Sequence, residues 1–111
     1  MEEEVYELVY YRTSHGKIPY REWFESIRDF KAQAVIDSRL TRLRLGNFGK
    51  CEPVGQGVFE LKIYYGPGYR VYFSKVGSEI ILLLCGGDKS HQHKDIAQAQ
   101  NYWQQHKEKQ R

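Results

Sequence analysis

Two β-prone runs on either side of a Gly-Pro-Gly segment at residues 66–68 constrain the fold of this chain more than any other feature. Residues 58–65 read VFELKIYY and residues 69–75 read YRVYFSK, so both runs are rich in aromatic and β-branched side chains. Glycine and proline between two such runs indicate the loop of an antiparallel hairpin. We therefore expect a hairpin with residues 66–68 as its loop.

This loop fixes which side chains share a face of the hairpin. Side chains alternate between the two faces of a strand, and directly paired residues lie on the same face. One face is then apolar, and the other carries lysine, arginine and tyrosine, whereas a two-residue loop would mix the two kinds of side chain. The expected pairs are Leu61 with Phe73, Lys62 with Tyr72, Ile63 with Val71, Tyr64 with Arg70, and Tyr65 with Tyr69.

The segments around the hairpin predict two further strands and three helices. Residues 5–11 are β-prone. Residues 79–85, EIILLLC, lack alternation, which is typical of a strand that is covered on both faces, and Gly86 and Gly87 are expected to end this strand. Apolar spacing predicts one helix that begins at Pro19, a second over about 30–45 and a third over about 90–107.

These elements predict the fold class. We expect a single domain over residues 1–111, because a chain of this length has room for one core. The element order β-α-α-β-β-β-α corresponds to an α+β fold with a small, mainly antiparallel sheet.

Composition narrows the class of protein further. The chain is 41% hydrophobic and 28% charged, which is typical of a globular domain in water, and its net charge of +3 suits an anionic partner. The longest apolar run, residues 80–85, is too short to span a membrane. Acidic residues at the start, Glu2, Glu3, Glu4 and Glu7, are unlike a secretory signal. We therefore expect a cytoplasmic protein that does not associate with membranes.

The polar face of the hairpin is the first candidate site, with Lys62 and Arg70 beside Tyr64 and Tyr72. Cations attract phosphate groups, and flat aromatic rings stack on unpaired bases. An ordinary solvated sheet face carries the same residue types. The pattern alone leaves both interpretations open.

A second candidate group follows the apolar strand in DKSHQHK, residues 88–94. Lys89, His91, His93 and Lys94 crowd the start of the predicted helix, where negative charge is normally preferred. Cations and open amides at a helix start suit an anion, and a histidine such as His91 exchanges a proton near neutral pH. The alternative is a poorly optimised surface turn.

The helix over about 30–45 carries a basic stripe that includes Arg39 and Arg42. Such a stripe is solvated surface in many proteins and contacts phosphates in some RNA-binding proteins. His91 and His93 do not share a helical face, and no neighbouring cysteine or glutamate completes a ligand set. We therefore expect no metal site, and the lack of a phosphate-binding loop motif predicts no nucleotide cofactor.

Several of these segments together resemble one family. Residues 60–73, ELKIYYGPGYRVYF, resemble the hairpin of the addiction module killer branch of the RelE/HigB-like toxins. Residues 82–89, LLLCGGDK, and residues 20–24, YREWF, are similar to two further segments of that branch. The likeness covers nearly the whole chain and includes Gln92, Asp95, Ile96, Ala99, Tyr102 and Trp103.

The resemblance implies a RelE-like fold and the toxin component of a type II toxin–antitoxin system, neutralised by a cognate antitoxin protein. Such toxins enter the ribosomal A site and cut mRNA without a metal ion. The ribose 2′-OH attacks the adjacent phosphate and leaves a 2′,3′-cyclic phosphate. By position, Lys62 and Arg70 match the family's hairpin cations, and Lys89 and His91 match the basic or histidine group after the last strand.

The chemistry of such a cut assigns tasks to these side chains. Cations neutralise charge on the pentacoordinate phosphate, one group accepts the 2′-OH proton, and another protonates the leaving 5′-oxygen. Lys62 serves as the base only if its surroundings favour the neutral amine, and His91 is then the acid, although the two roles are interchangeable. No carboxylate base is evident in the sequence.

Two other interpretations stay open. A ParE-like toxin resembles the RelE type in fold but poisons DNA gyrase. A non-catalytic RNA-binding module would use the same cationic and aromatic face.

Overall fold

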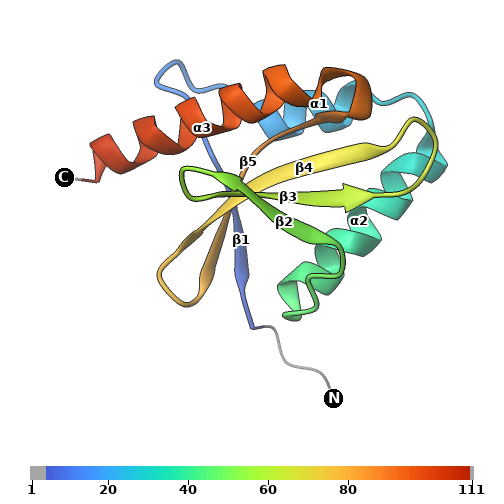
Figure 1. The fold of residues 1–111 in the computed structure, drawn as a ribbon, viewed down its shortest axis with the longest axis horizontal. Coiled ribbons are helices and arrows are strands. Elements are labelled where there is room, and N and C mark those ends of the chain that lie inside the picture. The colour runs from blue at the N-terminus through green and yellow to red at the C-terminus, as the bar shows by residue number, and fades with distance from the viewer. Residues whose placement is uncertain (1–4, 111) are drawn as a thin grey trace.

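The computed structural model describes residues 5–110, so the acidic start at Glu2, Glu3 and Glu4 lies outside the described residues. Five strands of the described part form one sheet in the spatial order β1-β5-β4-β3-β2 (Figure 1). The elements in chain order are β1 (Glu7–Tyr10), α1 (Pro19–Ser26), α2 (Phe30–Arg44), β2 (Cys51–Gly55), β3 (Val58–Ile63), β4 (Tyr69–Val76), β5 (Ile80–Asp88), the 3₁₀ turn η1 (Lys89–His91) and α3 (Gln92–Lys109).

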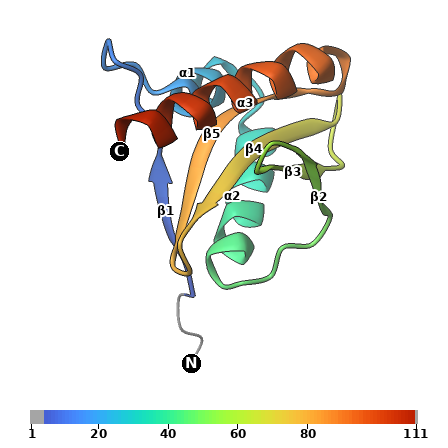
Figure 2. The same ribbon diagram turned by 60° about the vertical axis from the view of Figure 1, so that its left-hand side comes forward.

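Different helices cover the two faces of the sheet. In Figure 2, α3 lies in front of the strands, and α1 and α2 lie behind them. Tyr20 of α1 and Ile36 of α2 belong to the core on one face, while Ala99 of α3 belongs to the core on the other. The molecule therefore has three layers, with the sheet in the middle.

The apolar run in β5 lies in a strand that is covered on both faces, as its lack of alternation predicts. Ile81 and Leu83 belong to the core under α1 and α2, whereas Leu82 and Leu84 belong to the core under α3. A strand buried on both faces needs no polar face. The prediction that both faces of this strand are covered is confirmed.

The predicted fold class is wrong in strand content and in strand direction, although the fold is α+β overall. β1 runs parallel to β5, with Glu7 opposite Ile80 and Tyr10 opposite Leu83, so the sheet is mixed. β2 is an additional strand, antiparallel to β3. The order is therefore β-α-α-β-β-β-β-α instead of β-α-α-β-β-β-α with a small, mainly antiparallel sheet.

Local chemistry explains how β2 forms although Pro53 interrupts it. Proline lacks an N–H group, and a strand tolerates this at the edge of a sheet, where β2 lies. Gln56 and Gly57 have φ angles of 56° and 85°, as a two-residue type I′ turn requires, and they connect β2 directly to β3. Glutamine is uncommon at positive φ, so the sequence signal for this turn is weak.

The β3–β4 hairpin has the predicted apolar face but a different register. Lys62 pairs with Arg70, and Ile63 pairs with Tyr69, which leaves residues 64–68 as the loop. Inside this loop the Gly68 N–H donates to the Tyr65 carbonyl over 3.0 Å. A register shift of two residues leaves every side chain on its face. The buried apolar set is therefore the predicted one, Leu61, Ile63, Val71 and Phe73.

Gly86 and Gly87 do not end β5, which continues to Asp88. A Cβ atom at Gly86 would fall on the ring of Trp23, and one at Gly87 would fall on the carboxylate of Asp95. Glycine lets α1 and α3 approach this strand closely from both faces. α3 begins later than predicted, after η1, and no helix within residues 5–110 is both long and apolar enough to cross a membrane.

Candidate functional site

A hollow of about 340 Å³ lies beside the hairpin loop. The Lys89 N–H donates to the Gly68 carbonyl over 2.8 Å, which holds η1 against this loop. Two predicted cations, Arg70 and Lys89, therefore lie at one place, together with the ring of Tyr64, which is 70% exposed. The lining residues are Tyr64, Tyr65, Gly66, Pro67, Gly68, Arg70 and Lys89.

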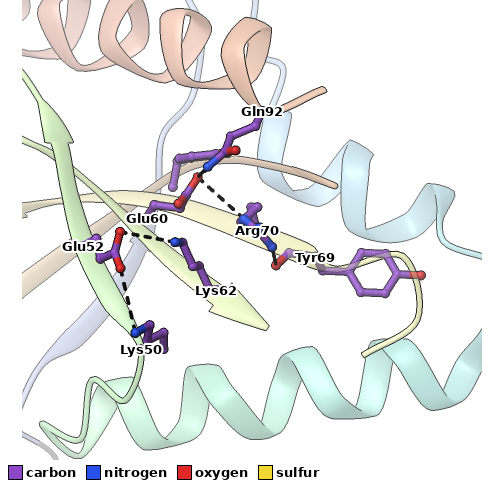
Figure 3. A network of polar contacts seen from close by, with 8 residues as sticks. Lys50, Glu52, Glu60, Lys62, Tyr69, Arg70 and Gln92 are labelled. Atoms are coloured by element: carbon purple, nitrogen blue, oxygen red, sulfur yellow. Dashed lines mark hydrogen bonds and ion pairs between the residues drawn. The ribbon is translucent and has the colours of Figure 1, made fainter. Parts of the chain in front are cut away.

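Lys62 and Arg70 are paired residues of β3 and β4, so the structure brings these two predicted site residues together. Both project from the sheet face that α3 partly covers, and each has a glutamate partner (Figure 3). Lys62 Nζ lies 3.2 Å from Glu52 Oε2, on β2, and the Lys62 side chain is 20% exposed. Lys50 Nζ lies 4.0 Å from the other oxygen of Glu52.

Arg70 is more deeply buried than Lys62, with 7% of its side chain exposed against 20%. Its Nε atom is 3.8 Å from Glu60 Oε2, and its Nη1 atom donates to the Tyr69 carbonyl over 3.3 Å. Glu60 Oε2 also accepts hydrogen bonds from the Tyr72 hydroxyl (2.9 Å) and from Gln92 Nε2 (2.8 Å). The guanidinium therefore lies between a buried carboxylate and the hollow.

The turn after β5 is organised around the carboxylate of Asp88. Asp88 Oδ1 accepts hydrogen bonds from the Ser90 N–H (3.0 Å) and hydroxyl (2.6 Å), and His91 Nδ1 lies 3.0 Å from it. These hydrogen bonds, the one from the Ser90 side chain above all, lower the pKa of Asp88 below its ordinary value. His91 remains exposed, and Asp88 fixes the orientation of its ring.

Tyr72 does not lie on an open face, and its predicted contact with RNA is wrong. Its side chain is fully buried under α3, in the core that includes Ala99. Burial and the hydrogen bond to Glu60 raise the pKa of Tyr72, so its hydroxyl stays protonated and donates to Glu60. The hairpin pattern does not show that a helix later in the chain covers this half of the face.

The other predicted RNA contacts occupy three different places. His93 and Lys94 are exposed in the first turn of α3, directly after η1. Arg39 is partly buried and donates from Nη1 to the Lys62 carbonyl over 3.1 Å, so it links α2 to β3. Arg42 is exposed in the last turn of α2, on the helix that packs against the opposite face of the sheet. Arg42 is therefore not part of the hollow.

Two glutamates contribute to the site although the sequence interpretation omits them. Glu52 lies on β2, an additional strand that the sequence pattern does not indicate, and Glu60 lies on β3. The hairpin pattern holds no signal for Glu60, because alternation places it on the polar face, and that half of the face is buried only by α3. Within residues 5–110 no group of three or more His, Cys, Asp or Glu side chains is arranged to hold a metal ion.

Comparison with known proteins identifies a relative of this chain. No family model matches the chain. An uncharacterized protein of Haemophilus influenzae (strain ATCC 51907 / DSM 11121 / KW20 / Rd) is 45% identical over 82 residues, which cover 74% of this chain and 83% of that protein. Identity at this level over most of both chains establishes common descent, and this chain belongs to the same family as that Haemophilus influenzae protein.

Proposed function

We propose that this chain is a toxin of the RelE/HigB type that cuts messenger RNA by attack of a ribose 2′-OH on the adjacent phosphate. The hollow at the hairpin loop carries the proposal, because Arg70 and Lys89 lie there beside the exposed ring of Tyr64. A phosphate between the two cations and a base stacked on the tyrosine ring would use all three side chains.

The cations act on the charge that develops during the reaction. Attack by the 2′-oxygen forms a new O–P bond and increases the negative charge on the pentacoordinate phosphate. Arg70 and Lys89 stabilise that charge from the hollow, and Lys62 does so from the neighbouring strand. Because Arg70 is held by the fold before RNA binds, little reorganisation is needed at the moment of reaction.

His91 is the group that we assign to the leaving oxygen. With Nδ1 beside Asp88, the ring nitrogen that faces away is Nε2, and this atom donates a proton to the 5′-oxygen as the P–O5′ bond breaks. Lys62 Nζ forms an ion pair with the Glu52 carboxylate over 3.2 Å. Lys62 therefore stabilises charge, and Glu52 beside it is the group that can accept the 2′-OH proton.

The same proposal places the protein in the cytoplasm, with a cognate antitoxin as its inhibitor and the ribosome as its platform. A site with few groups needs its substrate aligned by something else, and the ribosome supplies that alignment for the mRNA. The chemistry assigned above uses side chains alone.

The test is cleavage of mRNA on purified ribosomes, mapped by primer extension for the wild type and for variants of exposed site residues. Lys89→Ala and Lys62→Ala each remove a cation without emptying a buried position, and each should slow cleavage by about 100-fold or more. Lys17→Ala, which removes an exposed cation from the loop after β1, serves as the matched control and should cleave like the wild type.

Three results would contradict the proposal. Unchanged cleavage in both Lys62→Ala and Lys89→Ala would mean that the site is elsewhere. DNA breaks that depend on gyrase, without mRNA cleavage, would favour a ParE-like toxin. Binding of RNA without mRNA cleavage and without gyrase-dependent DNA breaks would indicate a non-catalytic RNA-binding module.

A further inference from the structure

Glu60 and Arg70 are the charged side chains that the described part of the chain buries, with 1% and 6% of their surfaces exposed. A charge in the interior is costly unless it has a partner and hydrogen bonds. Apolar side chains of similar volume would fill the same space at less cost. The position of this pair beside the hollow indicates a use beyond folding.

The contacts of the Glu60 side chain converge on one carboxylate oxygen. Oε2 accepts hydrogen bonds from the Tyr72 hydroxyl and from Gln92 Nε2, and Arg70 Nε lies 3.8 Å away. The three partners come from β4 and from the first residue of α3. Glu60 therefore connects two strands to the helix that follows the Lys89–His91 turn (Figure 3).

The two ends of the Arg70 guanidinium lie in different surroundings. Nε is buried, makes no hydrogen bond to any described residue and lies 3.8 Å from Glu60 Oε2, so the Glu60 carboxylate acts on it through its charge. Nη1 reaches the hairpin loop, where it would lie 3.4 Å from a Cβ atom placed on Gly68. Glu60 thus contacts the guanidinium from behind, and the hollow lies at its other end.

We propose that Glu60 is a positioning residue that fixes Arg70, and through Gln92 the start of α3, in the arrangement that receives the scissile phosphate. Glu60 itself does not touch RNA. This inference rests on the proposed function, because the purpose of the fixed guanidinium is to stabilise the reacting phosphate.

The test is a double-mutant cycle on the full chain. Glu60→Gln preserves the size of the side chain and one acceptor oxygen but removes the charge that faces Arg70. It should lower the single-turnover rate of mRNA cleavage by about 10-fold to 100-fold. In the Arg70→Lys background the same change should cost less than about 3-fold, because the positioned group is already gone.

Tyr72→Phe is the matched control, since it removes a hydrogen bond to the same oxygen and leaves the charge in place. Its cleavage rate should stay within about 3-fold of the wild type. The inference would be overturned if Glu60→Gln lowered the cleavage rate equally in the wild type and in the Arg70→Lys background. The two residues would then act independently. Urea unfolding of each variant verifies that the compared samples are folded.

A second readout does not depend on cleavage. The Nε proton of Arg70 should exchange slowly with water in the wild type, as observed by ¹H–¹⁵N spectroscopy, and at least about 10-fold faster in Glu60→Gln. Equal exchange in the two proteins would overturn the positioning role. If Glu60→Gln mobilises Arg70 while Arg70→Lys leaves cleavage unchanged, the positioning of Arg70 stands and its role in the proposed function fails.

Discussion

Lys62 and Arg70 lie directly opposite each other in the antiparallel β3–β4 pair, and each of these two cations has its own glutamate. Like charges at directly opposite positions of a sheet repel each other. Glu52 compensates Lys62 at the exposed edge, and Glu60 compensates Arg70 in the interior. The sheet can therefore hold two positive charges side by side.

The different burial of the two ion pairs predicts different costs when they are broken. Glu52→Ala should change the free energy of unfolding by less than about 1 kcal/mol, because exposed ion pairs contribute little. Arg70→Ala should lower it by about 3–5 kcal/mol, because Glu60 is left buried without its cation. Urea unfolding measures both changes, and equal costs would contradict the described burial.

The hydroxyl of Tyr72 should matter for stability. Tyr72→Phe removes a buried hydrogen bond to a carboxylate and should lower the free energy of unfolding by about 1–3 kcal/mol. Tyr64→Phe is the control, because Tyr64 is exposed, and its stability should match that of the wild type. An unchanged unfolding midpoint for Tyr72→Phe would argue against the hydrogen bond.

Gly86 should not tolerate a larger residue. Gly86→Ala places a methyl group on the ring of Trp23 and should lower the free energy of unfolding by about 1–3 kcal/mol. Combining it with Trp23→Phe, which shortens the ring system, should recover part of this loss. Costs that simply add in the double variant would mean that the two residues do not meet.

The turn after β5 predicts a pH dependence. The pKa of Asp88 is lowered in the folded protein, so its stabilising effect is complete above the ordinary value of 3.8 and is lost as the pH falls through the lower folded value. Asp88→Asn still offers an acceptor to the Ser90 N–H but does not ionise. It should therefore lose less stability than the wild type when the pH falls from about 5 to about 3.

Asp37 provides a control of opposite sign. Burial raises the pKa of Asp37, so the folded protein takes up this proton more readily than the unfolded chain, and the associated stabilisation disappears as the pH rises. Asp37→Asn should lose more stability than the wild type over the same fall in pH. Identical pH profiles for the two asparagine variants would contradict at least one of the two assignments.

Much of the core could be predicted from local pattern. Alternation around Leu61 and Val71 identified the face of the hairpin that packs against α1 and α2, and the unbroken run 80–85 identified a strand covered on both faces. The register could not be predicted, because hydrogen bonds inside the hairpin loop decide where the ladder ends. Because side chains alternate with a period of two residues, their pattern cannot distinguish two strand registers that differ by two residues.

The sheet edges and the buried part of the site needed tertiary information. β2 could not be recognised from the sequence, because it contains Pro53 and is followed by an unusual Gln-Gly turn. The parallel pairing of β1 could not be predicted either, because β1 and β5 are separated by most of the chain. The sequence showed which residues are cationic, but Tyr72 and Glu60 became buried only because α3 packs over that half of the sheet. Lys89 lies near Arg70 because its N–H donates to the Gly68 carbonyl, and no sequence pattern indicates this hydrogen bond.

The most direct measurement of the proposed activity is the chemistry of the cut ends. Ribosome-bound mRNA is prepared with either the normal ribose or a single 2′-deoxyribose at the mapped cleavage position, and both are treated with the wild-type protein. Attack by the 2′-OH predicts a 2′,3′-cyclic phosphate on the normal RNA and no cut at the deoxy position. Cleavage of the deoxy-substituted RNA at an undiminished rate would contradict this mechanism at the hollow lined by Arg70 and Lys89.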